Sequence, residues 1–251
     1  MKTFVYIIII LSLIMSACSN ESPKPRTKDE TLSQMQTSIK AIDSLSSDSE
    51  NQTTVIYNKF TTRFTQMTNS QTSSDNTVNL SVEADSNHSR YPVKSYQAYV
   101  RNGALKANPV PTYITYQARR ADTKYIETAV ADIFNLNRIL QGVVKPVADK
   151  VTIDKDSIKY TGNNQVLKEL FEYGLSSSSL NQVEALSDLT DLKVAAGEYT
   201  VNYSPAKVYP KTLSFKVEMT ATIDEEPVRI QMEQTTNYSD FNKTTVTDPT
   251  E

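Results

Sequence analysis

Few residues of this chain are able to carry covalent chemistry. It has one histidine, His88, set between Asn87 and Ser89 in a polar stretch, and one cysteine, Cys18. A hydrolytic triad would need His88 as its base, yet the sequence has no G-x-S-x-G nucleophile elbow to place beside it. Zinc sites need clusters of histidine and cysteine, which this composition does not supply. We therefore expect a solvated loop histidine, and a protein that is no enzyme and binds no metal or cofactor.

The acidic and serine-rich stretches also lack the spacing of a functional site. We interpret Asp224-Glu225-Glu226 as a turn and Asp154-Lys155-Asp156 as a charged break in a strand. Neither matches a calcium loop, whose ligands alternate around a central glycine. There is no glycine-rich phosphate loop, and residues 176–179, all serine, are expected to be a flexible linker.

The surroundings of Cys18 indicate export. Lys2 is followed by an unbroken apolar run from Phe4 to Leu11, which continues through Leu13, Ile14 and Met15. Two small residues and then the cysteine come next. A positive start, a short apolar core and a small-residue cleavage site are typical of a secretory signal. The core of about a dozen residues is shorter than the roughly 20 that a membrane-spanning helix needs.

The motif Met15-Ser16-Ala17-Cys18 resembles the lipobox of bacterial lipoproteins, with Met15 where leucine is usual. The resemblance implies that residues 1–17 are a signal peptide and that Cys18 becomes the mature N-terminus, carrying a diacylglyceryl group. Two acyl chains anchor a protein stably, whereas one binds a membrane only marginally. The implied location is the cell membrane, lipid-anchored and facing outside. The alternative is an ordinary signal peptide with Cys18 as an incidental free thiol.

Charge and composition set the remaining limits. The whole chain has a formal net charge of −3, and loss of Lys2 with the signal leaves about −4, so nothing suggests a nucleic-acid partner. Residues 18–30, with Pro23 and Pro25, are expected to be a flexible tether. The remaining 31–251 are expected to form a single domain, which we expect to be a monomer.

Apolar spacing predicts mostly strands in the first half of the chain. Between Val55 and Met67 helical and strand signals conflict, and we favour a strand. In chain order we expect a helix over 32–45 capped by Asp29 or Thr31, a polar loop over 46–54, a strand over 55–67, a hairpin loop over 69–76, strands over 78–82 and 96–100, and a hairpin of 113–116 with 124–127.

The middle of the chain is predicted to be helical and the end to return to strands. We expect helices over 133–144, ended by Pro146, over 166–171, closed by Gly174, and over 180–186, with a strand over 151–160 between the first two. Strands over 199–203, 213–219 and 228–232 follow, and an extended tail begins at Tyr238.

This order favours an α+β fold: a strongly curved antiparallel sheet, an open half-barrel, with helices on its concave face. It resembles the LolA/LppX-like group of exported lipoproteins, in particular uncharacterised members from Gram-positive bacteria. The resemblance is carried by the lipobox, the leading helix over 32–45, Gly197-Glu198-Tyr199-Thr200-Val201, Tyr209-Pro210, the hairpin over 213–232, Tyr238-Ser239-Asp240-Phe241-Asn242 and Val246-Thr247-Asp248-Pro249.

Fold analogy suggests a binding module that holds an apolar ligand, a lipid or a lipid-linked molecule, between sheet and helices. The candidate ligand-binding residues are Leu136, Ile139, Leu140, Tyr113 and Tyr116. The same helices would equally serve as a solid core, and the tyrosines as an ordinary sheet edge. The alternative is a surface protein with a filled core that binds an envelope or host partner.

The lipid anchor is tested by replacing the sulfur that would carry it. We expect Cys18→Ser to move the protein from the membrane fraction to the soluble fraction of its host, because no thioether can form. Fractionation followed by immunoblotting measures this, with Ser19→Ala as the matched control. Unchanged fractionation of Cys18→Ser would show that the anchor is elsewhere or absent.

Overall fold

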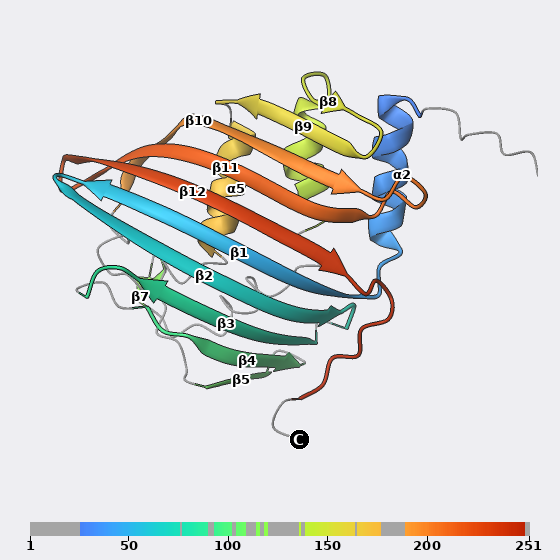
Figure 1. Ribbon diagram of the computed structural model, residues 1–251, viewed down its shortest axis with the longest axis horizontal. Helices are drawn as coiled ribbons and strands as arrows, with labels where there is room; N and C mark the ends of the chain where they lie inside the picture. The colour runs from blue at the N-terminus through green and yellow to red at the C-terminus, as the bar shows by residue number, and fades with distance from the viewer. Residues whose placement is uncertain are drawn as a thin grey trace, which may run out of the picture.

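Figure 1 shows the computed structural model of the chain, which describes residues 26–75, 77–89, 93–101, 104–108, 114–115, 118–119, 136, 139–163, 165–176 and 189–248. The helices are α2 (Lys28–Lys40) and α5 (Gln165–Ser176), with a π-helical turn η2 (Ile139–Val144) and a 3-10 turn η3 (Lys145–Val147). The strands are β1 (Ser44–Tyr57), β2 (Phe60–Ser73), β3 (Val78–Ser86), β4 (Tyr96–Arg101), β5 (Ala104–Asn108), β6 (Ile114–Thr115), β7 (Ala118–Arg119), β8 (Thr152–Ile153), β9 (Ser157–Gly162), β10 (Thr190–Tyr203), β11 (Pro210–Ile223) and β12 (Glu226–Ser239).

Ten strands form one open antiparallel sheet in the order β5-β4-β3-β2-β1-β12-β11-β10-β9-β8. Its two halves, β1–β5 and β8–β12, are meanders of neighbouring strands. They are joined by β1 and β12, which pair in register from Ser46 opposite Ser239 to Tyr57 opposite Val228. The predicted α+β class with an antiparallel sheet is confirmed.

One face of this sheet is covered and the other faces solvent. Along β11 the side chains of Leu213, Phe215, Val217 and Met219 are buried, while those between them are not. Helix α5 packs against the buried side and contacts β10, β11 and β12, behind the strands as drawn in Figure 1. We call the side that α5 covers the covered face, and the opposite side the outer face.

The N-terminal strands begin earlier and run longer than predicted. Residues 46–54, expected to be a polar loop, belong to β1, and β2 continues to Ser73, into the expected hairpin loop. The prediction of 46–54 was wrong because both faces of β1 are polar there, so no apolar alternation marks the strand. The strand character predicted over 55–67 is confirmed, but the single strand is not. Residues 55–57 end β1 and residues 60–67 begin β2, with a turn between them in which Asn58 has φ 54°.

Helix α2 begins and ends before its predicted bounds. Thr27 is the N-cap: its hydroxyl accepts from the Glu30 backbone, and the Glu30 carboxylate accepts from the Thr27 backbone. This capping box, and not Asp29 or Thr31, starts the helix, which takes up the last residues of the predicted tether. The helix ends at Lys40, and the buried Leu45 already lies in β1.

The central helices also differ in detail from the prediction. Gly174 lies inside α5 rather than closing it. A Cβ at this position would approach Met232 Sδ to 2.4 Å and Phe215 Cζ to 2.9 Å, so glycine lets the helix lie close to the sheet. Pro146 belongs to η3, directly after η2, instead of ending a long α-helix. The helix predicted over 180–186 and the first residues of 133–144 lie outside the described residues.

Three smaller expectations change as well. The strand predicted over 151–160 is a hairpin of β8 and β9, with Asp154-Lys155-Asp156 as its turn. The hairpin predicted over 113–127 is described only as β6 paired with β7, so Arg119 belongs to a strand and not to the expected turn; residues 124–127 lie outside the described part. Tyr238 belongs to β12, opposite Ser47, and not to the tail.

Asn242, just after β12, fastens the end of the sheet to the beginning. Its Oδ1 accepts from the backbone N–H groups of Asp43 at 2.6 Å and Ser44 at 3.4 Å, and its Nδ2 donates to Ala41 O at 2.9 Å. The residue has φ 59°, a left-handed conformation that asparagine tolerates better than most residues. Asn242 therefore fixes the corner between α2 and β1.

We expect Asn242→Ala to lower the free energy of unfolding by about 2 kcal/mol, because it removes these hydrogen bonds and places alanine at positive φ. Urea unfolding of the full chain measures this. The control is Asn69→Ala, an exposed position on the outer face of β2, which we expect to change stability by less than about 0.5 kcal/mol. Equal effects of the two substitutions would contradict the proposed role of Asn242.

Candidate binding site

Polar side chains line the centre of the covered face. On β1 every second residue from Ser47 points to this face, and none is apolar until Val55. Neighbouring strands add polar residues at the paired positions. We call this set the polar belt: Ser47, Ser49, Asn51 and Thr53 of β1, Gln66, Thr68 and Ser70 of β2, and Gln234 and Thr236 of β12.

The belt is buried and joined by hydrogen bonds. Asn51 and Gln234 are 5% and 4% exposed, and Asn51 Nδ2 donates to Gln234 Oε1 at 2.9 Å. Gln234 Nε2 in turn donates to Thr236 Oγ1 at 3.2 Å, and Thr53 Oγ1 donates to Asn51 Oδ1 at 3.0 Å. These bonds offset the cost of burying polar groups, which is high when they lack partners.

Further hydrogen bonds extend the belt to its other strands. The hydroxyls of Ser47 and Ser70 lie 2.7 Å apart, and those of Ser49 and Thr236 lie 2.9 Å apart. Gln66 Nε2 donates to Thr68 Oγ1 at 2.9 Å. The belt therefore ties β1 to both of its neighbours through side chains as well as backbone.

The belt separates two apolar clusters. The larger cluster contains the buried residues of α2, α5 and the C-terminal strands, Leu167 and Phe171 among them. The smaller cluster lies on β3 and β4 and consists of Val78, Leu80, Val82, Tyr96, Ala98 and Val100. A solid core would be continuous across this boundary, whereas among the described residues it is interrupted by hydroxyls and amides.

A cavity lies at the boundary between belt and clusters. It measures about 20 Å³, room for about one water. Tyr173 of α5 lines it from the helix side and stacks at a tilt on Phe215, with ring centroids 6.5 Å apart. Its lining residues are Ser49, Asn51, Gln66, Thr68, Ser70, Leu80, Val82, Tyr96, Tyr173 and Gln234.

Two buried tyrosines lie on the C-terminal strands of the covered face. Burial raises the pKa of Tyr199, which stacks on Tyr160 with ring centroids 5.5 Å apart, far above its ordinary value, so its phenol stays protonated. Burial likewise raises the pKa of Tyr203, whose hydroxyl donates to Asp154 O at 3.0 Å.

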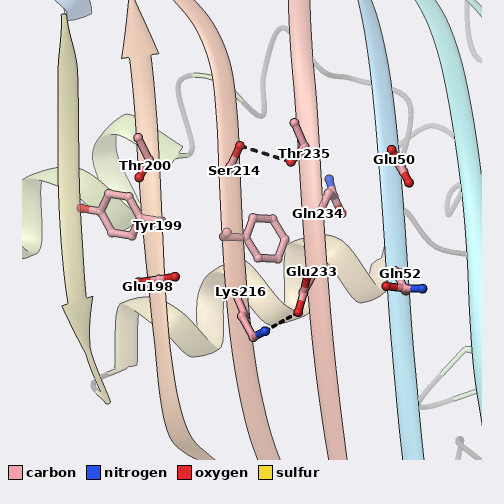
Figure 2. A pocket seen from close by; sticks show the side chains of 11 residues that line it. Glu50, Gln52, Glu198, Tyr199, Thr200, Ser214, Lys216, Glu233, Gln234 and Thr235 are labelled. Carbon is pink, nitrogen blue, oxygen red and sulfur yellow. Dashed lines mark hydrogen bonds and ion pairs between the residues drawn. The ribbon is translucent and has the colours of Figure 1, made fainter.

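The outer face has a different character. Over β10, β11, β12 and β1 it forms an open hollow of about 370 Å³, shown in Figure 2. Lys216 pairs with Glu233 across it, and the carboxylate raises the pKa of that lysine. The hydroxyls of Ser214 and Thr235 form a second bridge at 3.2 Å. Such exposed pairs add little stability and are screened by salt. We therefore interpret this hollow as a solvated surface of the sheet.

The structure describes only some of the predicted site residues. Leu136 and Leu140 are 3% and 1% exposed in the larger apolar cluster, and neither lines the cavity. Ile139 belongs to η2, but its side chain, like Tyr113, Tyr116 and Cys18, lies outside the described part.

The remaining expectations concern His88, metal binding and membrane-spanning helices. His88 follows β3, and its backbone N–H donates to Ser86 Oγ at 3.3 Å. Among the described residues no group of histidine, cysteine and acidic side chains is arranged to hold a metal ion. Within the same residues, no helix has the length and apolar character to span a membrane.

The polar belt itself was missed by the sequence interpretation. Its signal was present as the alternation Ser47, Ser49, Asn51, Thr53. The residues between these positions are equally polar, so the pattern identified neither the strand nor the face that would be buried.

Comparison with known proteins does not assign a family. No family model matches the sequence, and no curated protein matches it. Among solved structures, a lipovitellin structure on lipid–protein interactions is similar at a TM-score of 0.32 and 9% identity, over 82% of this chain and 26% of that chain. The chain thus spans about a quarter of lipovitellin.

Two further structures are similar at lower scores. A DUF1329 family protein from Desulfovibrio piger has a TM-score of 0.26 and 8% identity over 84% of this chain and 90% of its own. The attachment invasion locus protein Ail of Yersinia pestis, in complex with sucrose octasulfate, has a TM-score of 0.23 and 7% identity over 79% and 99%. These likenesses are too distant to carry an argument, and the resemblance to LolA/LppX-like lipoproteins stays a prediction.

The bond between Asn51 and Gln234 can be tested by a double-mutant cycle. We expect Asn51→Leu and Gln234→Leu each to cost about 2 kcal/mol, because each leaves one buried atom of the other amide, Gln234 Oε1 or Asn51 Nδ2, without this partner. The double variant should cost less than the sum of the two, with a coupling of about 1–2 kcal/mol. Urea unfolding measures all three.

The matched control is the outer-face pair Ser214→Ala and Thr235→Ala, which hydrogen-bond in solvent across β11 and β12. We expect their effects to be additive within about 0.5 kcal/mol. Additive effects at Asn51 and Gln234 would show that the amides are not paired in the folded protein.

Proposed function

We propose that this chain is a non-enzymatic binding module, anchored outside the cell through Cys18, that holds an apolar ligand such as a lipid or a lipid-linked molecule between its sheet and helix α5. The observation that carries the proposal is the polar belt, with its cavity, inside the covered face. Apolar side chains would fill a purely structural core with less cost than buried amides. Polar side chains at core positions that could hold apolar ones are expected at functional sites.

The ligand would enter at the boundary between the two apolar clusters. The cavity there holds about one water, so binding requires Tyr173 to move away from the smaller cluster. The main sheet contacts of α5 are with β10, β11 and β12. Helix α5 can therefore keep its contacts with β10, β11 and β12 while the space between the helix and strands β2 and β3 widens. A ligand favours the opened state by as much as it binds that state more tightly.

The anchor gives this proposal its setting. A diacylglyceryl group at Cys18 would hold the domain beside a membrane, where lipid ligands are concentrated. We include in the proposal that the sheet is a half-barrel with the helices on its concave side, as in LolA/LppX-like lipoproteins, and that the protein acts as a monomer.

A second candidate function is a surface interaction protein with a filled core. The small size of the described cavity favours it. So do Phe60 and Met67 on β2, which are large apolar residues 67% and 56% exposed. In this case the partner would bind the outside of the domain and the polar belt would only fix the register of the strands.

Single tryptophans distinguish the two functions, because the chain has none of its own. We expect the fluorescence of Tyr96→Trp, inside the cavity lining, to be quenched by dioleoyl lipids brominated on their acyl chains, because bromine must approach the indole closely. The full chain is mixed in non-ionic detergent with neutral and anionic brominated lipids together. Phe60→Trp, exposed at the start of β2, is the control and should keep its emission.

The comparison with unbrominated lipids corrects for any change of environment. Lack of quenching in Tyr96→Trp would remove the ligand site and favour the filled-core alternative. Equal quenching of both variants would show lipid on the surface and not between the sheet and the helix.

A further inference from the structure

The described lining of the covered-face cavity contains many hydrogen-bonding groups and no charged side chain. Its polar members are hydroxyls and amides, which both donate and accept. The charged residues of the same strands point the other way: Asp48 and Glu50 of β1, Arg63 of β2 and Glu233 of β12 are all exposed on the outer face. These charged residues therefore lie on the outer face, whereas the described lining of the cavity is polar but uncharged.

This uncharged lining restricts the ligand. A carboxylate or phosphate that enters the cavity would lose its hydration without a cation to pair with among the described residues, which is strongly unfavourable. A hydroxyl, ester or amide faces no such penalty. It can take the place of one partner in the chain of hydrogen bonds from Thr53 through Asn51 and Gln234 to Thr236.

The apolar part of the ligand has its own surface. Leu80, Val82 and Tyr96 line the cavity on the side of the smaller cluster, and Tyr173 lines it on the side of α5. An acyl chain between these groups would place its polar end against Asn51 and Gln234. The site thus has an apolar wall beside an uncharged polar floor.

The geometry points to an uncharged amphiphile as the ligand, a glycerolipid with a free hydroxyl and no phosphate or carboxylate, whose polar end is held by Asn51 and Gln234. This inference rests on the proposed function and names the ligand class of the same site. Anionic lipids with identical acyl chains have the same size but would find no cation among the described lining residues.

The test compares two lipids that share acyl chains and differ in charge. The full chain in non-ionic detergent is mixed with dioleoylglycerol or dioleoylphosphatidate at equal mole fraction, and native mass spectrometry measures the occupancy of each. We expect dioleoylglycerol to bind at least about tenfold more tightly, because the phosphate would be buried without a counter-charge.

Three variants locate the effect. Gln234→Leu should lower dioleoylglycerol affinity about fivefold, the loss of one hydrogen bond, whereas Gln52→Leu, on the outer face of β1, should leave it unchanged. Thr68→Lys adds an ammonium group at a partly exposed lining position and should raise phosphatidate affinity about tenfold. This gain does not depend on the stability of Gln234→Leu.

The outcomes separate this inference from the function beneath it. Phosphatidate binding as tight as that of dioleoylglycerol, or tighter, would overturn the inference and leave the apolar-ligand function standing. Binding of neither lipid would overturn both. A preference for dioleoylglycerol that Thr68→Lys reduces about tenfold supports both.

Discussion

The pairing of β1 with β12 is the constraint on which the rest of the structure depends. It joins the first and last long strands of the chain over twelve residue pairs, and without it the two meanders would be separate sheets. A slip by one residue would turn every side chain of β1 to the opposite face. Glu50 and Gln52 would then enter the covered face, and Asn51 would face solvent. The hydrogen bond between Asn51 and Gln234 therefore specifies register, in a strand whose own sequence has no apolar alternation to do so.

Polar contacts hold this register at one end and at its centre. At one end Asn242 ties the residue after β12 to the start of β1. At the centre the belt links side chains across β12, β1 and β2. Farther along the tail, Asn79 Nδ2 donates to Thr247 O at 3.2 Å and Lys106 pairs with Asp248, so the end of the chain also reaches the β3–β5 side. The sheet is thus fastened by polar contacts where its apolar core is interrupted.

The sequence predicts the C-terminal half of this fold much better than the N-terminal half. In β11 the buried Leu213, Phe215 and Val217 alternate with polar residues, so period and face are both visible. In β1 serine, asparagine and threonine alternate with equally polar neighbours, and only the partner strands decide which side is buried. Helix α2 was a different case, because the capping box of Thr27 and Glu30 could have been recognised from spacing alone.

The candidate site was beyond sequence reasoning for a geometric reason. Its lining comes from β1, β2, β3, β4, β12 and α5, segments that meet only after the register is set. The predicted arrangement of helices over a sheet led to a candidate apolar site that includes Leu136 and Leu140. Both residues are buried in the larger cluster. What the prediction lacked was the polarity of the surface beneath the helix. Apolar spacing identifies residues that leave water, but it does not identify buried hydroxyls and amides.

The interrupted core also has a consequence for dynamics. Proteins open first along boundaries with few buried apolar contacts. Among the described residues, the larger cluster, with α5, and the smaller cluster on β3 and β4 lie on opposite sides of the belt. Separating them exposes hydroxyls and amides that water or a ligand can satisfy, at less cost than exposing the same area of leucine and valine. The buried polar groups of the belt thus stabilise the core less than apolar groups would, and they also make separation of the two clusters less costly. A ligand with its own hydrogen-bonding end would replace the hydrogen bonds that this separation breaks.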